Sequence, residues 1–487
     1  MFDQDCVPYA PALIESMRSI GYTFPAAVAD LIDNSISAHS TRIDIFSEPS
    51  MDPYLVIIDN GCGMNKNEMF NAMRYGSKNP SNQRSRDDLG RFGLGLKSAS
   101  FSQCRKFIIV SKQGPNIYAY SWDLDYVIKS QSWKVISFAT EELLNLPKIE
   151  LLFPLFSGTY LILQNFDRIK DSTSDITKTF NKNLFEMIKH LSLVFHRFID
   201  DGIEMFFNND KIKPMDPFLT NHPATQKLRK SKFYIDDEEI GLEPYVLPYI
   251  SKLSDEDLQK VGGKEQLRND QGFYIYRNKR LIIWGSWFNL ERKCELNKLA
   301  RVRVDIPNTL DHIWSIDIKK STARLPDMVK DNMHNAVLSS VSSSKSVYTY
   351  RGRKERNDKA IEYVWERILT RNGGCEYQIN RNIPSLQLLS KTLDDSQVKL
   401  LNSVISTIET NFPKQSLYVD VANGNFEQDD CNETIEKIWG DLQVLIEFVK
   451  SQNLPVKNYY LLLMTVEPYC NHKAIIERIR KELENAE

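Results

Sequence analysis

Hydrophobic and polar positions follow two periods in the first 200 residues, and these periods predict alternating helices and strands. Apolar residues at helical spacing predict a helix over 26–37, with Thr23 as its cap and Pro25 in its first turn. A second amphipathic helix is expected over 181–200. Apolar runs bounded by turn residues predict strands at 54–58, 105–110, 117–123 and 158–164.

The rest of the chain changes pattern twice, which predicts three domains: 1–205, 206–345 and 346–487. The middle domain is expected to contain a hairpin over 272–283, turning near Asn278-Lys279, and a strand over 301–306. A serine-rich stretch over 339–346 marks the second boundary. Beyond it, helical patterns cover 355–371, 391–410, 432–452 and 472–486.

The composition mainly excludes certain kinds of binding site and cellular location. The chain has 487 residues, 42% of them hydrophobic and 26% charged, with a net charge of −2, so contact with nucleic acid would need a local basic surface such as the run at 351–356. Its 7 cysteines are scattered without CxxC pairs, which argues against a zinc site or a disulfide framework. No secretory signal or membrane-spanning run is evident, so a cytoplasmic location without membrane contact is expected.

Two stretches suggest phosphate and cation chemistry. Gly90, Gly93 and Gly95 precede residues that favour a helix, and a glycine loop feeding a helix N-terminus suits a phosphate. A tight turn that packs a helix on a sheet is the alternative. On the helix 26–37, an oxygen-rich face carries Asp30 and Asn34 one turn apart, together with Asp33, and suits a hard cation and a polarised water. The alternative is a solvated helix face.

A third stretch suggests recognition of an amine. The buried strand 54–58 ends in Asp59, and Gly61 and Gly63 follow. A carboxylate beside bare backbone suits a hydrogen bond to an exocyclic amine. Residues 76–90 are polar and rich in turn residues, and they are expected to form a mobile lid or, alternatively, an ordinary surface loop.

These stretches together carry a family resemblance. Residues 30–34 (DLIDN), 59–63 (DNGCG), 90–97 (GRFGLGLK) and 158–159 (GT) resemble, in order and spacing, the four motifs of the GHKL ATPases. That superfamily includes gyrase B, heat-shock chaperones, histidine kinases, MutL and MORC proteins. The resemblance implies an α+β Bergerat ATP-binding fold, a mostly antiparallel sheet with helices on one face. A transducer-like α/β domain and a helical C-terminal region would follow.

By position, the resemblance implies a site for ATP and Mg²⁺. Asn34 would bind the Mg²⁺, Asp59 the adenine amine, and Thr159 the adenine side. Asp30 would polarise water, although most hydrolysing members carry Glu there, so hydrolysis is expected to be slow. Lys320, in preference to Lys319, would reach the γ-phosphate from the second domain. The full set expected to bind nucleotide is Asn34, Asp59, Gly61, Gly63, Met64, Ser77, Lys78, Gly90, Phe92, Gly93, Leu94, Gly95, Lys97 and Thr159.

The phrases YIYRNKRLI (274–282) and DIKKS (317–321) are most similar to prokaryotic MORC-related ATPases, a group linked to restriction and phage defence. The resemblance therefore implies an ATP-gated homodimer acting on DNA, or with a nuclease, helicase or methyltransferase partner. Two alternatives stay open. One is a nucleotide-gated scaffold with little hydrolysis, and the other is a heat-shock-type chaperone.

Overall fold

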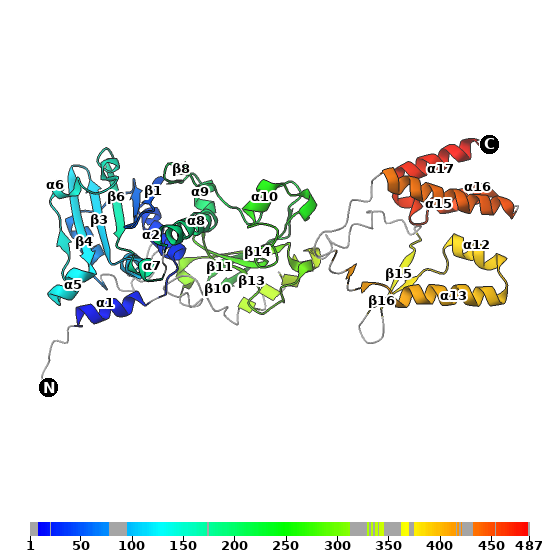
Figure 1. Ribbon diagram of the computed structural model, residues 1–487, viewed down its shortest axis with the longest axis horizontal. Coiled ribbons are helices and arrows are strands. Elements are labelled where there is room, and N and C mark those ends of the chain that lie inside the picture. The colour runs from blue at the N-terminus through cyan, green and yellow to red at the C-terminus, as the bar shows by residue number, and fades with distance from the viewer. Residues whose placement is uncertain are drawn as a thin grey trace, which may run out of the picture. The chain divides into compact units, whose positions relative to one another are not determined.

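The computed structural model describes residues 8–19, 21–76, 95–172, 175–311, 362–369, 375–414, 432–452 and 454–485, with parts of 329–344 and of 416–420. Contacts divide the chain into two compact units, residues 1–347 and 348–487. The first unit contains two sheets, and the second contains most of the C-terminal helices (Figure 1).

The first sheet has eight strands in the order β5-β4-β3-β6-β2-β1-β7-β8 (Figure 1). Every neighbouring pair is antiparallel except β1 and β7, which are parallel. The strands are β1 (Arg42–Glu48), β2 (Tyr54–Asp59), β3 (Lys106–Gln113), β4 (Asn116–Asp123), β5 (Ile136–Ser137), β6 (Ser157–Gln164), β7 (Glu204–Phe207) and β8 (Asp210–Lys211). The expected mostly antiparallel sheet is confirmed.

Helices cover one face of this sheet, as expected, and α2 lies at their centre against α4 and α8 (Figure 1). The other face is covered by residues 138–155, which include α6 and η1 (Ile149–Leu151). The helices here are α1 (Ala10–Arg18), α2 (Phe24–Ser37), α3 (Lys66–Met73), α4 (Gly95–Gln103), α5 (Leu124–Ser130), α6 (Thr140–Leu143), α7 (Asp167–Ser172), α8 (Ile176–Val194) and α9 (His196–Asp200).

The start of α2 confirms its predicted cap. The Thr23 side chain accepts a hydrogen bond from the Ala26 N–H, and Pro25 occupies the first turn, where no hydrogen-bond donor is needed. Ten of the 14 residues of this helix are buried. Because the helix is apolar on most sides, it forms the centre of the helical layer instead of its surface.

The second sheet of the first unit has the strand order β10-β11-β14-β12-β13, with β9 paired to β11. Its strands are β9 (Gln226–Lys227), β10 (Ser231–Ile235), β11 (Glu238–Val246), β12 (Gly272–Arg277), β13 (Arg280–Ser286) and β14 (Ala300–Ile306). The expected hairpin is β12–β13, and its two turn residues, Asn278 and Lys279, have φ of 49° and 69°. Two successive positive φ values define the type I′ turn, which matches the twist of a hairpin. Short helical segments beside this sheet are α10 (Asp255–Lys260), η2 (Ile250–Lys252), η3 (Glu295–Asn297) and η4 (Asn308–Leu310).

The two sheets of the first unit meet where α8 and α9 contact β13 and its neighbours. The ring of Trp284 packs 5.7 Å from that of His190. His196 and the Tyr276 hydroxyl are joined by a 2.8 Å hydrogen bond, and Arg197 pairs with Asp305. The expected 181–200 helix is therefore two helices, α8 and α9, and both contact the second sheet.

The second unit combines a two-stranded sheet with helices (Figure 1). Its elements are β15 (Trp365–Leu369), β16 (Cys375–Ile379), α12 (Pro384–Thr392), α13 (Asp395–Thr410), α15 (Asn432–Ser451), α16 (Val456–Leu463), η6 (Tyr469–Asn471) and α17 (Lys473–Asn485). The predicted helix over 355–371 is wrong at 365–369, which pair with β16 as a strand. The Trp365 ring packs 5.0 Å from that of Phe412, a contact that holds this strand beside the chain that follows α13.

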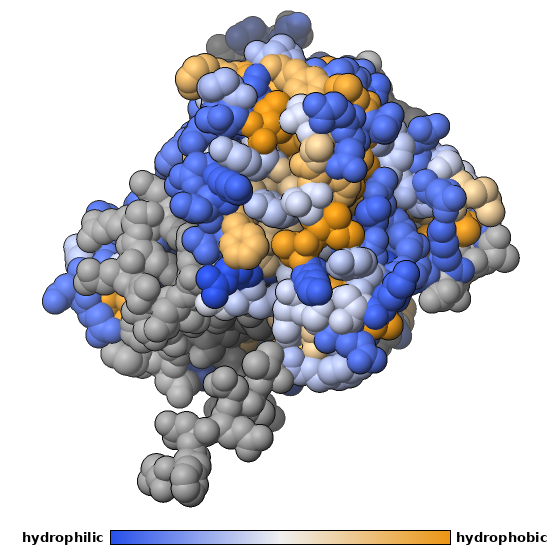
Figure 2. Space-filling view, turned by 90° about the vertical axis from the view of Figure 1, so that its left-hand side faces the viewer, coloured by the Kyte–Doolittle hydropathy of each residue, from blue (hydrophilic) through white to orange (hydrophobic). Residues whose placement is uncertain are grey.

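Apolar side chains are exposed at the end of the first sheet that carries β4 and β5 (Figure 2). Tyr126, Ile128 and Leu144 are exposed near α5 and α6. Figure 2 views this end of the molecule, where apolar side chains lie among hydrophilic ones. Within the described ranges, no helix has the length and apolarity that a membrane span requires.

Candidate active site

The carboxylate of Asp59 lies at the end of β2 and is 5% exposed. Its Oδ2 accepts a 2.8 Å hydrogen bond from the Ser35 hydroxyl, and its Oδ1 accepts a 2.9 Å bond from the Gly61 N–H. Burial raises the pKa of Asp59, and these hydrogen bonds, with one from the Thr159 backbone, act in the opposite direction. The residue that the sequence suggested for amine recognition is therefore buried and held in place by hydrogen bonds.

Three central strands bring the neighbouring predicted residues to Asp59. Thr159 of β6 stands opposite both Asp59 of β2 and Ser111 of β3. The Ser111 hydroxyl accepts a 2.8 Å hydrogen bond from the Met64 N–H, so the chain after Gly63 is tied to β3. Asp59, Thr159 and Met64 thus come together at one end of the sheet.

Backbone crowding at this end explains three of the glycines. Gly63 has φ of +67°, and a Cβ there would lie 2.1 Å from the Lys112 carbonyl oxygen. A Cβ at Gly158 would lie 2.2 Å from the Asp59 carbonyl oxygen. At Gly61 it would lie 2.8 Å from the Ala38 Cβ. Only glycine allows the chain to run this close to its neighbours.

The acidic face of α2 is mostly buried, contrary to the solvated-face alternative. Asp30 is 4% exposed and Asp33 2% exposed, whereas Asn34 is exposed and donates from Nδ2 to the Asp30 carbonyl oxygen. The cation beside the two acids is Arg280, from β13 of the second sheet. Tyr22 donates its hydroxyl to Asp30 at 2.8 Å, and burial is the main reason that the pKa of Tyr22 is raised.

Lys97 lies in α4 and is 1% exposed. Its ammonium donates hydrogen bonds to the carbonyl oxygens of Ala72 and Arg74, at 2.8 and 2.9 Å, where α3 ends. Burial lowers the pKa of Lys97 to about 8. In this structure the side chain satisfies the C-terminus of α3, and its role toward phosphate stays a prediction.

Several predicted residues lie outside the described part of the chain. These are Ser77, Lys78, Gly90, Phe92, Gly93, Leu94, Lys319, Lys320 and the basic run at 351–356. Gly95 is described as the first residue of α4, and a Cβ there would meet nothing within 4 Å.

Sequence reasoning missed four residues of this region: Tyr22, Ser35, Ser111 and Arg280. Ser35 follows the acidic positions of α2, and its spacing carried no signal. Arg280 stood in the hairpin phrase that supported the resemblance, but nothing tied it to α2. Two acids on a helix without any basic residue were the available signal, because buried carboxylates need a cation.

The described part of the protein offers few ligands for a magnesium ion. Within the described residues, no group of three or more His, Cys, Asp or Glu side chains could hold a metal ion. The exposed amide of Asn34 leaves its oxygen available for a hard cation. Because Mg²⁺ commonly combines one or two protein ligands with phosphates and water, this sparse donor set fits it.

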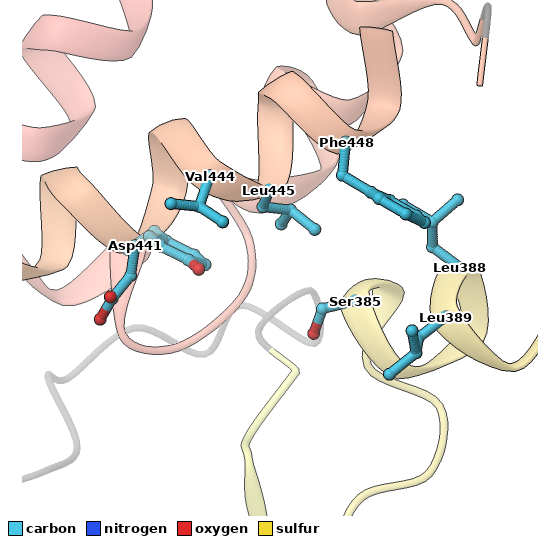
Figure 3. A pocket seen from close by; sticks show the side chains of 8 residues that line it. Ser385, Leu388, Leu389, Asp441, Val444, Leu445 and Phe448 are labelled. Carbon is cyan, nitrogen blue, oxygen red and sulfur yellow. The ribbon is translucent and has the colours of Figure 1, made fainter. Parts of the chain in front are cut away.

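A separate groove lies within the second unit, between α12 and α15 (Figure 3). It has a volume of about 360 Å³, and in Figure 3 Phe448 reaches toward Leu388. The lining residues are Ser385, Leu388, Leu389, Asp441, Val444, Leu445, Phe448 and Tyr469. With a single acid and no basic side chain in its lining, the groove lacks the charge expected for a phosphate site.

The first sheet, its helical layer and the acid at the end of a central strand define a GHKL-type ATPase domain. Residues 22–150 match the family model "Histidine kinase-, DNA gyrase B-, and HSP90-like ATPase". The family resemblance inferred from the four motifs is thereby confirmed.

Among relatives, the chain is similar to ATPase MORC2B of Mus musculus, with 38% identity over 91 residues, and to ATPase morc-1 of Caenorhabditis elegans, with 30% over 89. These matches cover 18% of the chain and only 9% and 10% of those proteins. The chaperone protein HtpG of Ehrlichia ruminantium is 22% identical over 292 residues, half of this chain and 45% of that protein.

We expect Gly63→Ala to destabilise the first sheet more than Gly114→Ala does. Both glycines have positive φ, but a Cβ at Gly114 would meet nothing within 4 Å. Gly114→Ala should therefore lower the free energy of unfolding by about 1–2 kcal/mol, from backbone strain alone. Gly63→Ala should lose roughly 2 kcal/mol more, because the backbone must move. Hydrogen exchange of the β2 and β3 amides measures both losses, and equal losses would contradict the crowding.

We also expect Lys97 to make stability depend on pH above neutrality. Its folded pKa of about 8 lies below the ordinary value, so between these two values the unfolded chain holds a proton that the folded chain has released. The free energy of unfolding of the wild type should then rise between about pH 8 and 10.5 relative to Lys97→Met, by up to roughly 3 kcal/mol. Urea titrations across this range measure the difference, and a difference that is constant with pH would be the opposite result.

Proposed function

We propose that the first unit binds ATP, with the adenine at the end of β2. The observation that carries this proposal is the buried Asp59 carboxylate, flanked by Gly61 and Gly63 and by two neighbouring strands. A carboxylate there accepts a hydrogen bond from the adenine amine, and the bare backbone lets the flat base lie close. The family match over residues 22–150 supports the same assignment.

The phosphates would then extend from β2 toward α2 and the start of α4. The helix α4 begins at Gly95, and the N–H groups and positive dipole of a helix N-terminus favour an anion. Asn34, exposed on α2, would hold the Mg²⁺, which supplies charge neutralisation to the phosphates when bound. The glycine loop before Gly95 and residues 77–78 complete the proposed nucleotide set.

Slow hydrolysis is the proposed reaction, with Asp30 polarising the attacking water. A carboxylate acts as a base when one of its oxygens accepts a proton from that water. The aspartate is one methylene shorter than glutamate, and a displacement of about 1 Å can lower a rate on the order of 100-fold. Lys320, from the segment after the second sheet, is proposed to contact the γ-phosphate and distinguish ATP from ADP.

At the level of the whole molecule, we propose an ATP-gated homodimeric clamp. ATP binding would favour a closed dimer that acts on DNA or with a nuclease, helicase or methyltransferase. The MORC-like phrases of the sequence support a proposed role in phage defence. A nucleotide-gated scaffold with little hydrolysis is the alternative favoured by Asp30. The likeness to a chaperone over 292 residues keeps a protein client as a further candidate.

We expect Asp59→Asn to weaken ATP binding by about 1–3 kcal/mol, because a charge-assisted hydrogen bond to the amine is lost. The amide also places an N–H₂ group where Ser35 or Gly61 donates, so the side chain is no longer held as in the wild type. Isothermal titration calorimetry with ATP and Mg²⁺ measures the change. Asp52→Asn, which alters an exposed carboxylate, is the matched control. A wild type that binds no ATP would refute the proposed function.

We expect a nonhydrolysable ATP analogue to give a more compact dimer than ADP gives, because only the triphosphate can bridge the two domains through Lys320. Lys320→Ala should remove this difference while ATP binding persists, and Lys319→Ala should not. Small-angle scattering with mass determination provides the measurement. Compaction enhanced by DNA, with strong salt dependence, supports the clamp. The same mass and shape in every nucleotide state would favour the scaffold, and compaction promoted by unfolded protein would favour the chaperone.

A further inference from the structure

A buried ion-pair cluster joins the proposed water-activating residue to the second sheet. Arg280 is 5% exposed and donates from Nη2 to Asp30 Oδ1 at 3.2 Å and from Nε to Asp33 Oδ1 at 2.6 Å. Tyr22 donates to the other oxygen of Asp30, Oδ2, at 2.8 Å. Both carboxylate oxygens of Asp30 therefore accept hydrogen bonds from side chains outside α2.

Arg280 reaches this position because its strand packs on the helical layer of the first sheet. It is the first residue of β13, which contacts α8, and its guanidinium lies 5.6 Å from the centre of the Phe195 ring. Lys279, one residue earlier, pairs with Asp201 just beyond α9 at 2.7 Å. The position of the hairpin relative to α2 thus decides whether Arg280 can reach Asp30.

The two bonds of Arg280 differ in a way that matters for release. The bond to Asp33 is the shorter, at 2.6 Å, and that to Asp30 is 3.2 Å. Asp33 can retain the guanidinium when it leaves Asp30, so the cation does not become an unpaired buried charge. A small displacement of the hairpin is then enough to free one oxygen of Asp30.

We propose that Arg280 restrains Asp30 and withholds this carboxylate from the attacking water until the second sheet shifts. We call this the Arg280 restraint. The inference rests on the proposed function of Asp30. Arg280 acts through Asp30 and is a positioning residue, not a catalytic one. The second sheet controls turnover by moving Arg280, separately from any contact that Lys320 makes with the nucleotide.

The test compares single-turnover ATP hydrolysis and ATP affinity in Arg280→Ala, Arg280→Lys and Tyr22→Phe. Loss of a hydrogen bond to a charged group corresponds to about 10-fold in rate where its release limits the reaction. Arg280→Ala should therefore hydrolyse ATP about 10-fold faster, with a dissociation constant within about threefold of the wild type. Arg280→Lys, whose single ammonium cannot bond both acids as the fork does, should show a smaller gain, and so should Tyr22→Phe.

A matched control comes from the same hairpin. Arg277 stands opposite Arg280 across the turn and forms a buried pair with Asp311, at 2.6 and 2.7 Å. Arg277→Ala should lose stability without any gain in rate. Adding Asp30→Asn to Arg280→Ala should abolish the gain, which separates release of Asp30 from general loosening.

Each outcome decides between the proposals. A hydrolysis rate that is unchanged or lower in Arg280→Ala, with ATP still bound, overturns the Arg280 restraint and leaves the proposed ATP binding intact. If Arg280→Ala does not fold, unchanged rates in both Arg280→Lys and Tyr22→Phe overturn it instead. ATP binding without hydrolysis in the wild type and in all variants also overturns the Arg280 restraint, because release of Asp30 from Arg280 should make hydrolysis measurable. Absence of ATP binding in the wild type refutes the proposed function, and the Arg280 restraint with it.

Discussion

The burial of two carboxylates on one helix is the constraint that shapes the first unit. An unpaired buried charge is unfavourable by several kcal/mol, and α2 contains no basic residue that could compensate Asp30 and Asp33. The compensating cation, Arg280, comes from the second sheet. The helical layer of the first sheet is therefore complete only when the second sheet is docked on it, which makes the two sheets interdependent in a way that apolar contacts alone would not.

The site combines two regions with different supports. Asp59 and Thr159 lie on neighbouring central strands, held by a continuous ladder of backbone hydrogen bonds. Asp30 instead depends on side chains that reach it from outside its helix, Tyr22 and Arg280. A ladder fixes the first region rigidly, whereas the second can change when one partner moves. Recognition of a base and control of a reaction are thus supported by separate parts of the fold.

Sequence patterns predicted the elements whose signals are local. The cap and apolar stripe of α2 and the continuous apolar run of β2 were found within one or two residues of their bounds. Patterns failed where a partner outside the element decides, as for β15, which pairs with the nearby β16 although its own sequence reads as helical. The site shows the same division. Asp59 follows from its strand, but 250 residues separate Arg280 from Asp30, and no local spacing encodes that pair.

The hairpin turn at Asn278 and Lys279 has a consequence for how this sequence can diverge. A two-residue turn fixes the register of its strands, and here it places Arg277 directly opposite Arg280. One inserted or deleted residue would rotate the following side chains to the opposite face of the sheet, and Arg280 would point away from both acids. We expect homologues to conserve the length of the turn even where the identity of the exposed turn residue Lys279 differs, a pattern usually associated with buried segments.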